Sequence, residues 1–127
     1  MLKLIDGLPD SVVGIEATGK ISAADYENIL VPAVTAVREK HGKVRMLYVL
    51  GPDFSGYDMG AIWQDTKLGL SHPASWRRLA VVSDHDWVRH LIHGFGWMIP
   101  ADTKLFADKE LDDAKAWVVA DPTTPDG

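Results

Sequence analysis

Hydrophobic residues recur in this chain with two different spacings, and stretches of the two kinds alternate. In five stretches the residues are continuously apolar, or alternate between apolar and polar, as in buried and half-buried strands. The predicted strands cover residues 3–6, 12–18, 44–50, 77–83 and 104–107. Turn residues from Gly7 to Asp10 separate the first two strands and predict an antiparallel hairpin.

Other stretches show the spacing of an amphipathic helix. The predicted helices cover residues 22–42, 58–70, 84–95 and 109–120. The first begins at Ser22, an N-cap residue with Asp25 three positions later, which is close to a capping box. Pro32 lies inside this helix and predicts a kink or a local break, because proline has no N–H group to donate. Residues 51–57, rich in glycine and proline, are predicted to form a loop.

Strands that alternate with helices indicate an α/β domain. We expect a mixed, mostly parallel five-stranded sheet covered by about four helices, with the antiparallel first strand at an edge. A chain of 127 residues fits one domain. We expect that domain to span residues 1–120, followed by a disordered tail over residues 121–127.

Charge and composition narrow the classes of function. The net charge of −5 and the scattered basic residues argue against a nucleic-acid partner. The chain has no cysteine, which excludes disulfides, thiolate catalysis and cysteine-ligated zinc. Its first residues lack the apolar stretch of a signal peptide, and no apolar run approaches the ~20 residues of a spanning helix. We expect a cytoplasmic protein, with peripheral contact to a membrane left open.

Four short stretches occur in a characteristic order. They are Tyr48–Gly51, the pattern Trp63-x-Asp65-x-Lys67 with His72 after it, Arg78–Asp84 followed by Trp87, and Phe106 with Ala114-x-x-Trp117. Taken together they resemble the SpoIIAA-like family, whose fold belongs with the STAS domains. The resemblance covers the chain from the first strand to about residue 119, and it implies a STAS-type α/β fold.

The resemblance also implies two kinds of function. SpoIIAA-like proteins have been suggested to bind apolar ligands and to associate with membranes, whereas STAS relatives act in regulation through a phosphorylated serine at the start of the second helix. Ser55 is the candidate for that serine here. Phe54 separates it from Asp53, whereas in the STAS phosphosite an acidic residue is usually followed directly by small hydroxyl residues and then glycine. A turn or capping role is the simpler interpretation of Ser55.

The helix predicted over residues 84–95 has one apolar and one polar arc. The apolar arc holds Trp87, Val88, Leu91, Ile92 and Phe95. The simpler interpretation is that this arc packs on the sheet. The alternative is a partly exposed surface for a ligand, a bilayer or a protein partner, to which tryptophan is suited because its ring is apolar and its N–H group is polar.

A site for an apolar ligand is predicted where this helix faces the helix over residues 58–70. The side chains that would line a gap between the two helices are Met59, Trp63, Trp87, Leu91 and Phe95. Methionine and aromatic side chains suit an adaptable apolar site. Simple core packing is the competing interpretation for each of them.

Evidence for metal chemistry or catalysis is weak. Asp86, His90 and His93 share one face of the helix over residues 84–95, as metal ligands do. A solvated polar face explains the same pattern, so we assign no metal and no cofactor. The motifs of a nucleophile elbow, a phosphate-binding loop or a dinucleotide site do not occur. We therefore expect a protein that is not an enzyme.

These patterns predict a non-enzymatic SpoIIAA-like domain that binds an apolar or lipid-like ligand, with association at a membrane surface as a further expectation. The alternative is a STAS-type regulatory module that acts through a protein partner, with Ser55 as its switch. A homodimer is compatible with both hypotheses.

Overall fold

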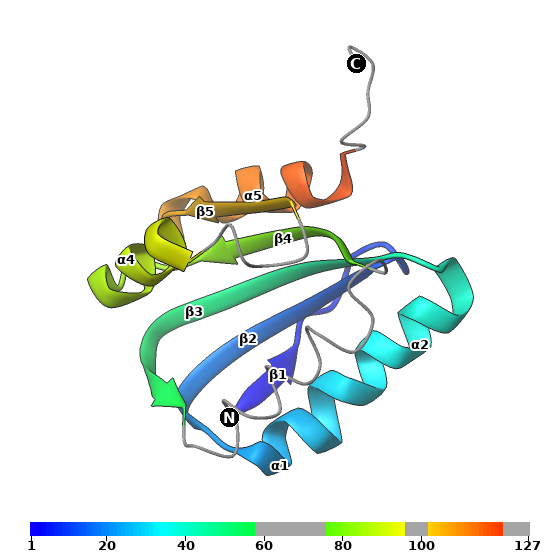
Figure 1. Ribbon diagram of the computed structural model, residues 1–127, viewed down its shortest axis with the longest axis horizontal. Coiled ribbons are helices and arrows are strands. Elements are labelled where there is room, and N and C mark those ends of the chain that lie inside the picture. The colour runs from blue at the N-terminus through cyan, green and yellow to red at the C-terminus, as the bar shows by residue number, and fades with distance from the viewer. Residues whose placement is uncertain (58–75, 96–101, 121–127) are drawn as a thin grey trace.

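The computed structural model describes residues 1–57, 76–95 and 102–120, which form a five-stranded sheet with helices on both faces (Figure 1). The strands are β1 (Leu2–Leu4), β2 (Val12–Ile21), β3 (Val44–Tyr57), β4 (Trp76–Val82) and β5 (Asp102–Phe106), and they lie in this order across the sheet. β1 pairs antiparallel with β2, and the other neighbours are parallel. The predicted mixed, mostly parallel sheet with an antiparallel edge strand is confirmed.

The helices follow the predicted order within the described residues. They are α1 (Ala23–Asp25), the π-helical turn η1 (Tyr26–Leu30), α2 (Val31–His41), α4 (Asp86–Phe95), the 3₁₀ turn η4 (Asp108–Glu110) and α5 (Leu111–Val119). The first three run on without a gap, as the helix predicted over residues 22–42 requires. The helix predicted over residues 58–70 and the tail predicted over residues 121–127 lie outside the described residues.

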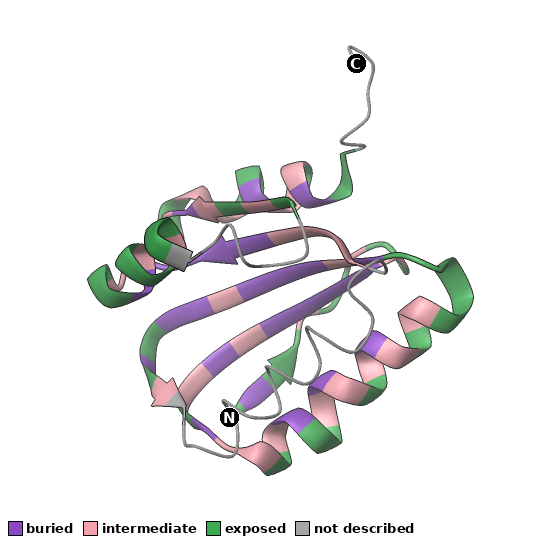
Figure 2. Ribbon diagram, viewed as in Figure 1, coloured by how far each residue is buried: buried purple, intermediate pink, exposed green. Residues whose placement is uncertain are grey.

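The central strands are buried on both faces, which explains their continuous apolar sequence. Successive side chains of a strand point to opposite faces of the sheet. Tyr48 of β3 belongs to the core beneath η1, α2 and α4, together with Leu30. Its neighbour Leu47 belongs to the core beneath α5, together with Val118. Figure 2 shows the resulting buried colour along β3 and β4, with α2 and α5 on opposite sides of the sheet.

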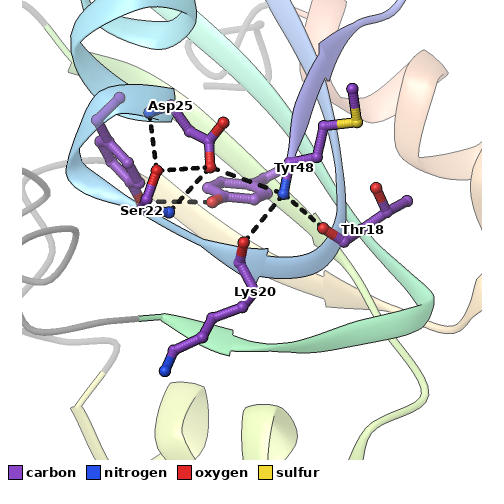
Figure 3. Close-up of polar contacts among 7 residues, drawn as sticks. Thr18, Lys20, Ser22, Asp25 and Tyr48 are labelled. Atoms are coloured by element: carbon purple, nitrogen blue, oxygen red, sulfur yellow. Dashed lines mark hydrogen bonds and ion pairs between the residues drawn. The ribbon is translucent and has the colours of Figure 1, made fainter.

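The start of the long helical unit is stabilised by a capping box. The side chain of Ser22 accepts a hydrogen bond from the Asp25 N–H (3.3 Å), and the Asp25 carboxylate accepts one from the Ser22 N–H (2.9 Å). The α-ammonium group of Met1 donates to the carbonyl oxygens of Thr18 (2.6 Å) and Lys20 (3.1 Å) beside this box (Figure 3). The hydrogen bond from the Ser22 backbone, more than any other contact, lowers the pKa of Asp25.

The local break predicted at Pro32 is a π-helical turn. The N–H of Val31 donates to the carbonyl of Tyr26, five residues earlier, and Pro32 lies in the first turn of α2 directly afterwards. A proline ring would crowd the carbonyl four residues before it in a regular α-helix. The wider turn moves that carbonyl away, so the helix continues past the proline.

The loop predicted over residues 51–57 is wrong, because β3 continues through this segment to Tyr57. Its second half pairs with the end of β2, where Phe54 lies opposite Gly19, and register shifts there absorb the irregular residues. The pairing of β3 with β4 ends at Val49. Pro52, which cannot donate a hydrogen bond, therefore lies where β3 has lost one of its two neighbours, and such an edge tolerates proline.

Candidate binding surface

Three aromatic rings meet where the second half of β3 passes the start of α4. Phe54 of β3 is buried, and the ring of Trp87 stacks on it with centroids 5.5 Å apart and an interplanar angle of 25°. His85 approaches Phe54 edge-on, with centroids 5.9 Å apart, and lies 6.4 Å from the ring of Trp87. The stack fixes the plane of the Trp87 ring against the sheet.

His85 ties this cluster to two strands. Its Nε2 atom lies 2.8 Å from the carbonyl oxygen of Gly51 in β3. Because a carbonyl can only accept, Nε2 carries the proton and donates. The His85 N–H donates to the side chain of buried Ser83 (3.0 Å), whose own N–H donates to the carbonyl of Phe106 in β5 (2.9 Å). The segment between β4 and α4 is thereby bound to β3 and β5.

The apolar arc of α4 is divided between the core and the surface. Val88 is 3% exposed, and Ile92 packs against the same core. Trp87 and Leu91, one helical turn apart, are 45% and 48% exposed. Core packing therefore describes Val88 and Ile92, and a partly exposed surface describes Trp87 and Leu91. Figure 2 shows both colours along α4.

The predicted ligand-lining set is only partly within the described residues. Met59 and Trp63 lie outside them, and so does the proposed gap between their helix and α4. Phe95 is the last residue of α4, and its side chain lies outside the described part of the structure. We define the α4 surface as the exposed side chains of Trp87 and Leu91 together with Phe54 beneath Trp87.

Phe54 contributes to the α4 surface but was not among the predicted site residues, because it lies in the segment predicted as a loop. The signal was present, since Met46, Tyr48, Leu50 and Phe54 are all even-numbered positions of one strand and belong to one core.

Ser55, the candidate phosphorylation site, is exposed and lies within β3 directly after Phe54. The hypothesis placed it in a loop at the start of a helix. In the structure a strand residue, Gly56, and then Tyr57 follow it before the described segment ends.

Asp86, His90 and His93 are exposed along α4. Within residues 1–57, 76–95 and 102–120, no group of three or more His, Cys, Asp or Glu side chains is arranged to hold a metal ion. The exposure of the three side chains gives α4 a polar face toward solvent.

Two carboxylates meet where β4 and β5 end. The Asp108 N–H donates to the Asp84 carboxylate (3.1 Å), which joins the segment before α4 to the turn before α5. Burial, and then the negative charge of Asp84, raise the pKa of Asp108. The sequence analysis did not pair these two residues, because they lie 24 positions apart.

Arginines at the opposite ends of the strands bind the end of α5. Arg45 donates to the carbonyls of Val118 (2.8 Å) and Ala120 (2.6 Å), and Arg78 donates to the carbonyl of Trp117 (2.7 Å). The last carbonyls of a helix have no partner within it, and these side chains supply one. The two arginines therefore have a structural role.

The family follows from comparison with known proteins. The family model described as SpoIIAA-like matches residues 12–119. The chain belongs to the SpoIIAA-like family. The resemblance drawn from the four ordered stretches is confirmed.

A solved structure shows the same fold. The chain is similar to an uncharacterized protein of the DUF3478 family from Shewanella loihica PV-4, whose crystal structure is described as SpoIIAA-like. The TM-score is 0.71 and the sequence identity 25%, over 93% of this chain and 92% of the other. No curated protein matches the chain. In the part of the chain that the structure describes, no helix is long and apolar enough to cross a membrane.

Proposed function

We propose that this SpoIIAA-like domain is a non-enzymatic binding module that takes an apolar or lipid-like ligand on the α4 surface. The observation that carries the proposal is the exposure of Trp87 and Leu91 beside a buried aromatic ring. Trp87 rests on Phe54 with one face and presents the other. A large apolar side chain held rigid at the surface loses little conformational entropy on binding, which favours a ligand.

The gain from covering these two side chains alone is modest, so a ligand needs further contacts to bind. Half of each of the two side chains is exposed. Burying that area contributes about 1 kcal/mol or more per side chain at roughly 25 cal/mol per Å². A ligand that also contacts neighbouring parts of the protein, or a bilayer that receives the indole ring, adds to this.

Charge indicates which membrane surface would suit the protein. The chain carries a net charge of −5, so attraction to anionic headgroups does not assist adhesion. Binding would depend on apolar insertion by Trp87 and Leu91. We therefore expect vesicles of neutral phosphatidylcholine to bind at least as well as vesicles that contain phosphatidylserine.

Two measurements test the proposal. Native mass spectrometry of freshly purified protein should show a co-purified lipid-like mass. Flotation with phosphatidylcholine vesicles should recover the protein. The double variant Trp87→Ala, Leu91→Ala should lower the affinity for these vesicles about tenfold, which corresponds to a loss of ~1.4 kcal/mol. The matched control is Val119→Ala, because Val119 is exposed to a similar degree (41%) but lies on α5.

An apo mass together with no vesicle binding would count decisively against the proposal. Equal loss in the double variant and in the Val119→Ala control would also contradict it, because the α4 surface would then have no special part in binding.

A regulatory module with Ser55 as its switch is the second candidate, and the exposure of Ser55 favours it. A phosphate there would add about two negative charges at an exposed position of β3, directly after Phe54 in the chain. Phosphorylation of Ser55 by a cognate kinase should then change the affinity for a protein partner. If Ser55→Asp alters neither partner binding nor vesicle binding, this candidate fails.

A further inference from the structure

The exposed side of α4 combines large apolar residues with a glycine. Trp87, Leu91 and Gly94 are at spacings of four and three residues, so they follow one stripe along the helix, and all three are exposed. A Cβ atom built on Gly94 would meet nothing within 4 Å. Glycine within a helix is less favourable than alanine. Gly94 therefore leaves a shallow hollow at one end of the stripe, while Trp87 projects at the other end.

We propose that α4 pairs with α4 of a second copy of this chain, antiparallel and about a twofold axis. In this arrangement Trp87 of each copy covers Gly94 of the other, and the two Leu91 side chains meet near the axis. The hollow at Gly94 admits the indole ring because close approach of two helices requires a small residue at the contact. A twofold interface uses the same patch on both copies, so the patch must be self-complementary.

The polar side chains beside the stripe satisfy that requirement. Asp86 lies in the first turn of α4 and His93 in the last. Their seven-residue separation brings them to the same flank of the helix. When two such helices run antiparallel, Asp86 of one copy comes beside His93 of the other, twice per dimer. An imidazole N–H can donate to a carboxylate, so the two pairs favour the antiparallel orientation.

The interface would regulate the α4 surface. α4 has ten residues and is therefore about 15 Å long, which gives a small interface and a weak dimer. Trp87 and Leu91 are covered in the dimer and free in the monomer. The self-pairing itself is independent of the proposed function, but its regulatory consequence, competition between the second copy and an apolar ligand, rests on that function.

Sedimentation velocity of the full chain over a concentration series tests the pairing. The chain should pass from monomer to dimer as its concentration rises. Gly94→Gln fills the hollow and replaces glycine with a better helix former, so the monomer should fold at least as well. We expect this variant to dimerise at least about tenfold more weakly, because both symmetric contacts between Trp87 and Gly94 are lost. Ala36→Gln, at an exposed position of α2, is the matched control and should dimerise as the natural chain does.

A charge exchange tests the orientation. Asp86→Lys alone and His93→Glu alone should each weaken dimerisation. The first change puts an ammonium group beside the imidazole of the other copy, and the second puts two carboxylates together. Mixing the two variants should restore a heterodimer with two favourable pairs. This rescue does not depend on the stability of either monomer.

The outcomes separate this inference from the proposed function. A chain that stays monomeric at every concentration, a dimer that Gly94→Gln does not weaken, or a mixture without rescue would each overturn the pairing. Vesicle binding that is lost in the Trp87 and Leu91 double variant but retained in Gly94→Gln would support the ligand surface independently. Dimerisation without vesicle or lipid binding would leave the pairing in place and refute the proposed function.

Discussion

α4 and α5 are both short amphipathic helices that follow a strand of the same sheet, yet their apolar residues are buried to different extents. Ala114 and Val118 of α5 are fully buried. Among the apolar residues of α4, Val88 is buried while Trp87 and Leu91 are half-exposed. Burial of a helical stripe thus depends on how far the opposing sheet extends, and the residues left uncovered are the ones available for binding.

The tryptophans show the same difference. Trp117 of α5 lies beneath the guanidinium group of Arg78, 4.3 Å from the ring centroid, and contacts Phe106 at 5.9 Å. Trp87 of α4 has its stack on Phe54 on one side and solvent on the other. One ring is a structural element of the domain, and the other is presented at its surface.

The largest expected effect on stability comes from removing the contacts of Arg78 that bind the end of α5. Arg78→Ala removes a hydrogen bond to the Trp117 carbonyl (2.7 Å), the contact with the Trp117 ring and an ion pair with Asp102 (3.5 Å). We expect a loss of about 2–4 kcal/mol in the free energy of unfolding, measured by urea denaturation. Arg89→Ala on α4 is the control and should cost less than about 0.5 kcal/mol. Equal costs would remove the distinction between the two helices.

Smaller effects on stability are expected from substitutions on the buried side and on the exposed side of α4. Val88→Ala leaves a cavity in the core and should lower the free energy of unfolding by about 2 kcal/mol. Leu91→Ala should change it by less than about 0.5 kcal/mol, because Leu91 is 48% exposed. The same urea measurement tests both. A large cost for Leu91→Ala would mean that Leu91 belongs to the core and is not available to a ligand.

The smallest effect concerns the carboxylate pair that connects the two helices. Because the pKa of Asp108 is raised in the folded protein, its contribution to stability is present below the ordinary value of 3.8 and is lost as the pH rises through the folded pKa. At pH 7 the two carboxylates repel each other. Asp108→Asn removes this repulsion and introduces an amide donor near Asp84, so it should stabilise the protein at pH 7 by about 0.5 kcal/mol.

The readout for this pair is the pH dependence of thermal unfolding. Asp108→Asn should gain stability over the natural chain at pH 7 and lose that advantage as the pH approaches the ordinary value of 3.8. Asp6→Asn, an exposed carboxylate in the turn between β1 and β2, serves as the control. An advantage of Asp108→Asn that does not change with pH would show that the pair does not titrate as described.

Much of the fold was predictable because its signals are local. The capping box at Ser22, the break before Pro32 and the apolar run of β4 each depend on residues close in the chain. The extension of β3 through Pro52 was not predictable in this way. Glycine and proline there indicate a loop, and only pairing with the end of β2 makes the segment a strand.

The candidate site shows the same division. The sequence by itself determined that α4 has an apolar arc, since 3.6 residues per turn place Trp87, Val88, Leu91 and Ile92 together. Tertiary structure alone decided which half of that arc is covered, because coverage depends on the shape of the sheet beneath. It also brought Phe54 under Trp87 and Asp84 beside Asp108, residues distant in the chain that meet only when the ends of parallel strands come together at one edge of the sheet.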